Sequence, residues 1–343
     1  MKTDPILILS TGRCGSTMIS DILGKHPKVL SLSEFFVPLG SAAFSNKAPT
    51  GPQMWQILSQ QTPALRMMLE DGIVVDEGLY PFNSPQARFT PKNIPPILSV
   101  ALPHLTDAHE ALYDELELLV KARPRCPLAE QYQFLFEALA NKYQRDVWVE
   151  RSGGSFMIAA TLLKLFPQAK VIHVFRDGRD TALSMSQHHN FRLLLAMLQK
   201  SQSLGIDVFK AWHKPHIGPQ KLWLEKLLMP FFNTRQMKSQ EFPLVEYGKL
   251  WSNMILAGSA ILATLPKDRL LSVKFEAVQQ DPRKELNELI RFISPELEDA
   301  HWLDTVSQIP RPTRSKYREL SEAERLALTQ ACEPGLKILG YPL

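Results

Sequence analysis

The most chemically suggestive stretch of the sequence runs from Ser10 to Thr17 and reads STGRCGST. Its two glycines allow the backbone to turn sharply and to approach an anion closely. The helix expected after Gly15 would add free N–H groups and a partial positive charge, and Arg13 adds a full cation. The stretch is not a complete Walker A motif, because Ser16 stands where that motif has lysine. The alternative is an ordinary glycine-containing turn capped by a hydroxyl, but composition and position favour a phosphate-binding loop.

A second group of candidate residues follows the apolar run KVIHVF at 170–175. Arg176 and Arg179 come after this run, and Ser184 lies eight residues beyond Arg176. Ligands in open α/β sheets bind beyond the carboxyl ends of the strands, so this cation and hydroxyl could hold a second phosphate. The alternative is that the arginines pair with the neighbouring aspartates in a solvated loop. The two groups together indicate a ligand with two separated anionic groups.

Both groups require a strand before them and a helix after them, and the spacing of apolar residues predicts such elements. This repeated order indicates an α/β fold with a doubly wound, central parallel sheet flanked by helices. We expect strands at residues 6–10, 28–33, 147–149, 170–175 and 269–278. We expect helices at residues 17–26, 104–145 with a break at 123–127, 155–166, 181–189, 246–265 and 281–293. Asp281 is the expected N-cap of the last of these helices, with Pro282 in its first turn.

Two long segments, 36–145 and 188–245, interrupt this pattern. The chain is expected to be a single domain, 1–343, in which these segments are helical or irregular inserts that cover the substrate. Residues 36–103 are expected to be largely irregular, as part of a substrate lid. The inserts hold many aromatic residues, and a buried core explains these more simply than a lipid or aromatic acceptor does. They are Trp55, Phe82, Phe89, Phe191, Trp212, Trp223, Phe231 and Phe232.

The composition limits the class of protein. There are 39 basic and 35 acidic residues, and a formal charge of +4 is too small to indicate nucleic acid or a membrane surface as partner. Three cysteines without close spacing do not predict a disulfide framework or a cysteine-based metal site. The apolar run at 6–9 is too short for a signal peptide, and no stretch reaches the length of a membrane span. We therefore expect a cytoplasmic protein.

The two anion-binding motifs resemble, in this order, those of the sulfotransferases that use 3′-phosphoadenosine 5′-phosphosulfate (PAPS). STGRCGST is similar to the loop that binds the 5′-phosphosulfate, and VIHVFRDGRDTALSMS is similar to the strand, loop and helix that bind the 3′-phosphate. LLSVKFEAVQQDPRKELNELIRFI resembles a later strand and helix of the family. RSKYRELSEAE resembles, more weakly, the basic segment that closes over the nucleotide. The two inserts are unmatched.

The resemblance implies a P-loop NTPase-like fold and in-line transfer of a sulfuryl group from PAPS to an acceptor hydroxyl or amine, without a metal. Arg13 takes a place usually held by lysine and would contact the bridging oxygen and the 5′-phosphate. Arg176 and Ser184 would hold the 3′-phosphate. The nucleotide-binding residues implied are Arg13, Cys14, Gly15, Ser16, Thr17, Arg176, Ser184, Arg314, Lys316 and Arg318.

The acceptor must lose a proton, so a general base is expected nearby. Glu34, after the strand at 28–33, is the first candidate for this catalytic role beside Arg13, because several sulfotransferases resemble this chain in placing a glutamate there. His188 and His189 are the reserve candidates, although such a pair is more often solvated. His173 alternates with apolar residues and is expected to be a packed core histidine.

Four further residues depart from the family pattern, carry an alternative or have an expected structural role. Cys14 is expected to fill the loop rather than to act as a thiol nucleophile. Arg151 follows a strand but lacks the proline that related sequences have nearby, which puts any role for it in doubt. Phe275 replaces a frequent tyrosine, and Glu276 beside it is expected to be structural.

Two other functions remain open from the sequence. One is a P-loop-type nucleotide-dependent kinase or NTPase on the same sheet, and the other is a non-catalytic nucleotide-binding protein of the same fold. The joint presence of Arg13, Arg176 and Ser184 speaks against the second. The expected acceptor is a small molecule, a lipid or a glycan, not nucleic acid. The aromatic residues of the inserts could also serve a homo-oligomer.

Overall fold

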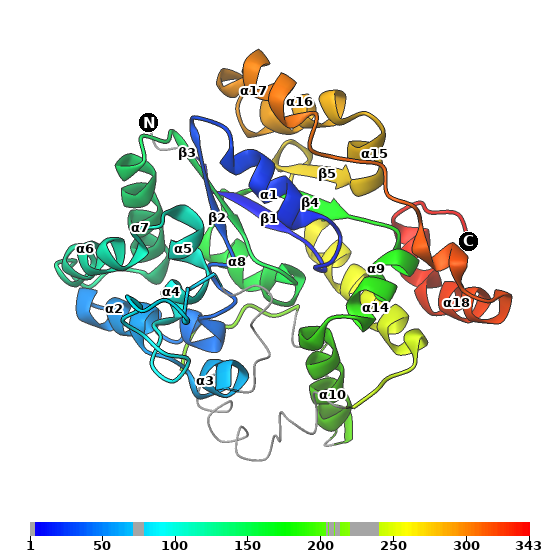
Figure 1. Cartoon of the computed structure of the whole chain (residues 1–343), viewed down its shortest axis with the longest axis horizontal. Coiled ribbons are helices and arrows are strands. Elements are labelled where there is room, and N and C mark those ends of the chain that lie inside the picture. Colours follow the sequence, from blue (N-terminus) through cyan, green and yellow to red (C-terminus); the bar gives the residue numbers. More distant parts are fainter. Residues whose placement is uncertain (1–3, 71–78, 204, 206–208, 210–212, 220–239) are drawn as a thin grey trace. The chain divides into compact units, whose positions relative to one another are not determined.

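A computed structural model of the chain describes residues 4–70, 79–203, 205, 209, 213–219 and 240–343. Five strands in the described residues form one sheet in the order β2-β3-β1-β4-β5 (Figure 1). The pairings of β1 with β3, of β1 with β4 and of β4 with β5 are parallel. The strands are β1 (Ile6–Leu9), β2 (Val29–Ser33), β3 (Val147–Arg151), β4 (Lys170–Phe175) and β5 (Leu270–Lys274). The strand order changes direction at β1, so the predicted doubly wound sheet is confirmed.

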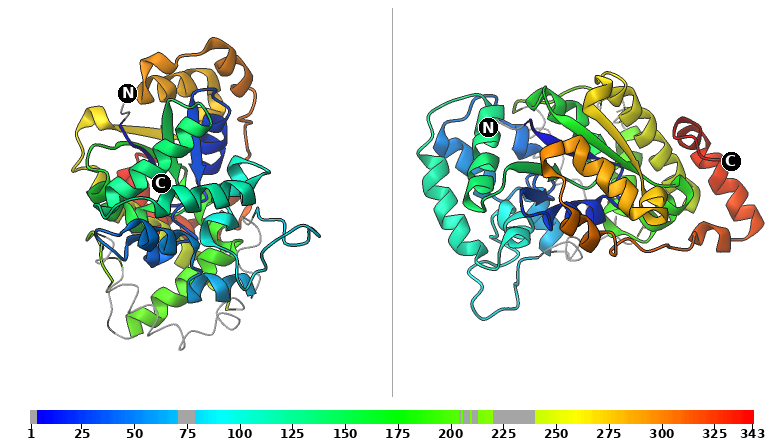
Figure 2. Two further views of the ribbon diagram at one scale, coloured as in Figure 1. Left: turned by 90° about the vertical axis from the view of Figure 1, so that its left-hand side faces the viewer. Right: turned by 90° about the horizontal axis from the view of Figure 1, so that it is seen from above.

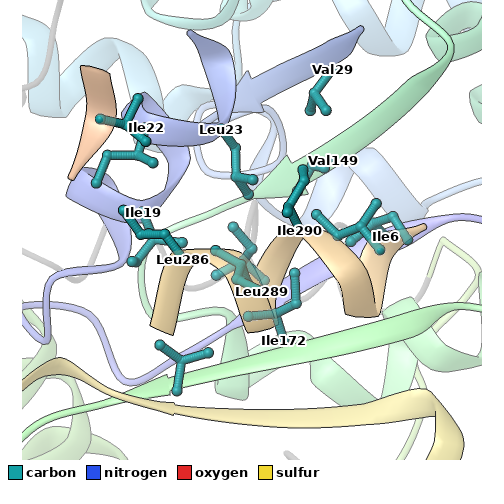
Figure 3. Packing of buried hydrophobic residues seen from close by; sticks show 14 of the residues in the cluster. Ile6, Ile19, Ile22, Leu23, Val29, Val149, Ile172, Leu286, Leu289 and Ile290 are labelled. Atoms are coloured by element: carbon teal, nitrogen blue, oxygen red, sulfur yellow. The ribbon is translucent and has the colours of Figure 1, made fainter. Parts of the chain in front are cut away.

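One face of the sheet is covered by α1 (Ser16–Gly24), α16 (Pro282–Ile293) and α17 (Ala300–Val306). Every second strand residue, such as Ile6, Val149 and Ile172, packs there against apolar side chains of these helices (Figure 3). α16 presents Leu286, Leu289, Ile290 and Ile293 to this cluster, which is the helical spacing of its sequence. Burial of the strands on both faces explains their continuous apolar runs.

The other face is covered by η2 (Ser155–Ile158), α8 (Ala159–Leu165) and α14 (Leu244–Leu262). Trp148 of β3 packs edge-on against Phe166, and His173 of β4 lies beside Phe156. A side chain at Gly258 of α14 would collide with the Phe156 ring, so this helix approaches closely. Figure 2 shows α14 and α16 on opposite sides of the strands, as a doubly wound fold requires.

Helix ends in this part of the chain follow local capping signals. Asp281 accepts a hydrogen bond from the Lys284 N–H and Pro282 follows it, as predicted for the start of α16. α9 (Gly178–Ser186) begins three residues earlier than expected, because Asp177 caps it by accepting from the Arg179 N–H. The predicted strand at 269–278 is also shorter, since β5 ends at Lys274 and α15 (Phe275–Gln280) follows directly. The remaining elements here are α10 (His189–Ser203), η4 (Lys267–Arg269), η5 (Pro295–Leu297), η6 (Lys316–Glu319) and α18 (Glu322–Ile338).

The chain divides into two compact units. The first comprises residues 1–31, 145–215 and 240–343, and the second comprises residues 32–144 and 216–239. Most of the predicted insert 36–145 falls in the second unit, whereas the insert 188–245 is divided between the two and lies partly outside the described residues. Trp212, Trp223, Phe231 and Phe232 are among the residues outside the description. The number of domains stays a prediction.

The second unit is more regular than the sequence suggested. Its elements are η1 (Gly40–Phe44), α2 (Gly51–Ser59), α3 (Pro63–Glu70), α4 (Pro96–Ser99), α5 (Ala101–Leu105), α6 (His109–Lys121) and α7 (Leu128–Lys142). The prediction of a largely irregular 36–103 is therefore wrong for residues 40–44, 51–59, 63–70, 96–99 and 101–103, whereas residues 79–95 have no helix or strand. α2 carries a capping box between Thr50 and Gln53, a local signal that weak periodicity obscured. Trp55 on this helix is buried, as expected for a core residue.

Aromatic rings form the core of the second unit. Phe35, Phe36 and Phe136 pack edge-on against one another, and Tyr132 stacks on Phe136. The Tyr132 hydroxyl donates to the Ala43 carbonyl at 2.7 Å, which satisfies the polar end of a fully buried ring. Within the described residues, no helix is both long enough and apolar enough to cross a membrane.

Candidate active site

The loop between β1 and α1 has an unusual backbone. Gly12, Arg13 and Gly15 have φ values of 79°, 57° and 91°, in the left-handed region that side chains disfavour. At Gly15 a side chain is also excluded sterically, because a Cβ atom there would lie 2.2 Å from the Phe275 ring. Turns of this kind can line up N–H groups into a concave surface for an anion. The loop is thus shaped as the sequence predicted for a phosphate-binding loop.

Serine hydroxyls hold this loop in place. Ser10 Oγ accepts a hydrogen bond from the Gly12 N–H at 3.2 Å and donates to Ser16 Oγ at 3.3 Å. The Ser10 N–H donates to Ser155 Oγ at 3.0 Å, and Ser155 Oγ in turn donates to the Ile8 carbonyl. Sequence reasoning missed Ser155, although a hydroxyl after the glycines that follow β3 was a signal available for it. Its position ties η2 to the end of β1.

The Cys14 side chain points into the core. It is fully buried and its Sγ donates to the Val174 carbonyl at 3.3 Å. Burial raises the pKa of this thiol, so it stays protonated at neutral pH. Burial therefore favours the interpretation of Cys14 as a loop filler over the thiol nucleophile, and the nucleotide contact expected of it stays a prediction.

The two predicted anion-binding motifs meet at Arg13. Its Nε donates to Ser184 Oγ at 3.1 Å, across 171 residues of sequence. Phe275 adds a second connection, because its ring packs on Gly15 and lies 5.0 Å from the Arg176 guanidinium carbon. Arg13 and Thr17 are exposed, and Arg176 keeps 19% of its side chain accessible. Cations and hydroxyls from both motifs thus gather at the carboxyl end of β1 and β4.

Arg179 does not join this group. It is buried and forms an ion pair with Asp177, with Nη2 and Oδ2 2.7 Å apart. Its guanidinium also donates to the Pro342 carbonyl at 3.0 Å and lies over the Tyr317 ring. For Arg179, the alternative of pairing with a neighbouring aspartate is correct, but the pair is buried rather than solvated.

Glu276 has the structural role expected of it. One carboxylate oxygen accepts from the Asp177 N–H at 2.9 Å and the other accepts from the Tyr341 hydroxyl at 2.8 Å. Burial and the neighbouring Glu276 carboxylate raise the pKa of Tyr341, which therefore remains a hydrogen-bond donor. These contacts fix the turn that precedes α9.

The basic C-terminal segment lies against α9. Ser315 Oγ and the Tyr317 N–H donate to the two carboxylate oxygens of Asp180, at 2.7 and 3.0 Å. The predicted nucleotide-binding cations Arg314, Lys316 and Arg318 alternate with these anchored residues and are exposed.

The candidate bases and core histidine differ in their surroundings. His173 is a buried core residue between Phe156 and Phe175, as predicted, and burial lowers its pKa to about 4. His188 and His189 are half-buried rather than solvated. The His188 ring lies 5.9 Å from that of Phe191, and Phe191 is the side chain nearest to a Cβ placed at Gly12. The reserve histidines are therefore close in space to the first loop.

Glu34 belongs to the second unit and directly follows β2. It is 5% exposed and has a φ of 54°, a conformation that costs energy for a residue with a side chain. Arg151 is the last residue of β3 and is buried. Within the part of the chain that the structure describes, His, Cys, Asp and Glu side chains form no group of three or more that could hold a metal ion.

The chain was compared with known proteins. The model of the sulfotransferase family matches residues 5–223. No curated protein matches the chain. Solved structures similar to it include the sulfotransferase domain of the olefin synthase from Synechococcus PCC 7002, with 18% identity and a TM-score of 0.47 over 100% of this chain and 96% of that one. Another is the sulfotransferase domain from the curacin biosynthetic pathway, with 14% identity and a TM-score of 0.47 over 100% of both chains.

A third similar structure is the sulfotransferase STF9 from Mycobacterium avium, with 13% identity and a TM-score of 0.43 over 100% of this chain and 78% of that one. The family model spans more than half of the chain and includes β1 to β4, both anion-binding motifs and α10. The chain belongs to the sulfotransferase family.

Proposed function

We propose that this sulfotransferase moves a sulfuryl group from PAPS to an acceptor hydroxyl or amine. The observation that carries the proposal is the 3.1 Å hydrogen bond from Arg13 to Ser184. This hydrogen bond joins the two predicted anion-binding motifs. Their resemblance to the family implies that one binds the 5′-phosphosulfate and the other the 3′-phosphate of a single nucleotide. A ligand with a 5′-phosphosulfate and a 3′-phosphate has the two anionic groups that such a pair of motifs could hold.

The first loop fits the 5′ end of this donor. Its left-handed backbone and the start of α1 present N–H groups, and Arg13 contributes a cation that is charged at any physiological pH. When bound, PAPS supplies the activated sulfuryl group. Arg13 would stabilise the negative charge that builds up on the departing phosphate oxygen, but it cannot serve as a proton donor. Ser16, Thr17 and the Cys14 N–H would complete the contacts.

The second motif fits the 3′-phosphate. Arg176 is partly accessible, and Ser184 lies on the same helix face as Asp180, one turn further on. Arg176 and Ser184 would each donate to phosphate oxygens in charge-assisted hydrogen bonds. Arg314, Lys316 and Arg318 would add cations from the segment held on α9.

Glu34 is the proposed general base. Support comes from its place after β2 and from its backbone, since left-handed conformations of side-chain-bearing residues concentrate at functional sites. His188 and His189 remain the reserve candidates. We propose in-line transfer without a metal, with the second unit and residues 188–245 selecting a small-molecule, lipid or glycan acceptor. A cytoplasmic location and a homo-oligomer also remain predictions.

Calorimetry with two nucleotides tests the proposal. Adenosine 3′,5′-bisphosphate is titrated with and without Mg²⁺, and ATP is titrated under the same two conditions. The proposal predicts binding of the bisphosphate that does not depend on Mg²⁺. Binding of ATP alone, and only with Mg²⁺, would contradict it and favour a kinase or NTPase, whereas binding of neither nucleotide would favour a protein that only retains the fold.

A further inference from the structure

The basic segment from 311 to 318 is held to the rest of the first unit at two places. Near its start, Gln279 of α15 donates to Thr313 Oγ1 at 3.0 Å. Near its end, Ser315 Oγ and the Tyr317 N–H both donate to Asp180 of α9. The segment has no regular structure before η6, so these side-chain contacts, rather than a helix or strand, decide its course.

Asp180 is the shared partner in this arrangement. Its side chain is 7% exposed and lies in the first turn of α9, where the helix dipole favours an anion. Each carboxylate oxygen accepts one hydrogen bond from the segment, and Oδ2 lies 3.9 Å from Arg176 Nη2. One carboxylate therefore contacts both the proposed 3′-phosphate arginine and the segment that carries three more cations.

Charge alone makes this placement unfavourable for phosphate binding. A carboxylate beside Arg176 repels an incoming phosphate and competes with it for the guanidinium. The alternating exposure of the segment suggests what offsets that cost: Ser315 and Tyr317 face Asp180 and are half-buried, whereas Arg314, Lys316 and Arg318 are exposed. Anchoring every second residue leaves the side chains between them exposed, although Arg314 also pairs with Glu319, with Nε and Oε1 3.5 Å apart in an exposed ion pair that a bound phosphate could replace.

We propose that Asp180 is a positioning residue for the 3′-phosphate, which acts by fastening the basic segment to α9. This role rests on the proposed function. It predicts a change in nucleotide affinity on removal of Asp180 that is opposite in sign to the change expected from charge repulsion alone. If Asp180 were only a nearby negative charge, its removal would tighten the binding of an anionic nucleotide. If it fastens the segment, its removal weakens that binding, because the loss of two hydrogen bonds releases the cations.

The test measures the affinity of the full-length chain for adenosine 3′,5′-bisphosphate and for adenosine 5′-monophosphate, which lacks the 3′-phosphate. Asp180→Ala is expected to weaken bisphosphate binding about tenfold and to change monophosphate binding little. Asp304→Asn serves as the matched control, because it removes one negative charge at an exposed site in the same unit and is expected to change neither affinity. Unchanged or tighter bisphosphate binding by Asp180→Ala would overturn the proposal.

Ser315 allows a second test that leaves all charges in place. Ser315→Ala removes the hydroxyl that donates to Asp180 and is expected to weaken bisphosphate binding about threefold, whereas Ser315→Thr keeps a hydroxyl and restores most of the affinity. Equal affinities for the alanine and threonine variants would contradict the proposed contact. Melting temperatures confirm that each variant is folded.

Limited trypsin digestion without ligand separates this proposal from the proposed function. Release of the segment should speed cleavage after Arg314, Lys316 and Arg318 in Asp180→Ala but not in Asp304→Asn. If the wild-type chain fails to bind the bisphosphate, the proposed function fails, and digestion still decides whether Asp180 holds the segment. An unchanged cleavage rate would refute that role.

Discussion

The two loops proposed to hold the donor are built in different ways. The loop after β1 depends on backbone geometry: left-handed residues, a tightly packed Gly15 and a Gly12 N–H that donates to Ser10 Oγ. The turn after β4 depends on charge. Arg179 pairs with Asp177, Arg176 lies near Asp180, and the Glu276 carboxylate accepts a hydrogen bond from the Asp177 N–H. The second loop therefore places carboxylates beside its arginines.

This difference indicates what each loop tolerates. In the first loop, a methyl group added at Gly15 should lower the free energy of unfolding more than the loss of the Arg13 side chain, which is exposed. In the second loop, the loss of a buried charge should do most damage, because its partner remains in a poorly solvated place. The predictions below test this distinction.

The largest effect is expected on catalysis from Arg13→Ala. Loss of the cation proposed to stabilise developing charge should slow release of adenosine 3′,5′-bisphosphate from the proposed donor about a hundredfold or more. The melting temperature should hardly change, because the side chain is exposed. Arg13→Lys should retain part of the rate, since it keeps the charge but loses the planar donor geometry. Release at the wild-type rate by the alanine variant would remove Arg13 from the mechanism.

The largest effect on stability is expected from Arg179→Ala in the second loop. It leaves Asp177 without its buried partner and should lower the free energy of unfolding by about 3 kcal/mol. The control is Arg283→Ala, which breaks an exposed pair with Asp304 and should cost less than about 1 kcal/mol. Denaturant unfolding of both variants makes the comparison, and equal losses would show that the second loop does not depend on buried charge.

Gly15→Ala should cause a somewhat smaller loss of stability. The new methyl group meets the Phe275 ring and forces an alanine into the left-handed region, at a cost of about 2 kcal/mol. Gly40→Ala shares the left-handed backbone but finds no atom within 4 Å of the added Cβ, so it should cost about 1 kcal/mol. If the two variants unfold at the same denaturant concentration, the packing of Gly15 does not shape the loop.

The smallest effect at neutral pH concerns His173, which lies in the strand leading to the second loop. Its pKa is lowered from 6.5 to about 4 in the folded chain, so the unfolded state binds more protons between these values. Stability should therefore fall as the pH drops from about 6.5 to about 4, by at most about 1.4 kcal/mol per pH unit, and this contribution is absent above that range. His173→Phe should flatten that part of the stability profile, and an unaltered slope would contradict the assignment.

The sequence predicted the first loop and its sheet because their signals are local. A four-residue apolar run, glycines and a following helix specify β1 and α1, and the same reasoning placed β4 and α16. The parallel sheet predicted that the two loops share one edge, but no pattern in the sequence predicted the hydrogen bond between Arg13 and Ser184, which are far apart along the chain.

Other features lay beyond the sequence signals used. Ser155 of η2 accepts from the Ser10 N–H at the end of β1, and the role proposed for Asp180 depends on Ser315 and Tyr317, which are distant along the chain. The helices between 36 and 103 were missed because their apolar faces are short and prolines interrupt the periodicity, while the capping box at Thr50 is visible only when the cap is sought first.

The central claim is that the two loops hold two phosphates of one nucleotide, and Arg176→Ala tests it most directly. Calorimetry of the wild type and the variant measures the affinity for adenosine 3′,5′-bisphosphate and for adenosine 5′-monophosphate. If Arg176 holds the 3′-phosphate, the variant should bind the bisphosphate at least about tenfold more weakly than the wild type does, close to its affinity for the monophosphate, which should be unchanged. An equal loss for both ligands, or no loss for either, would contradict it.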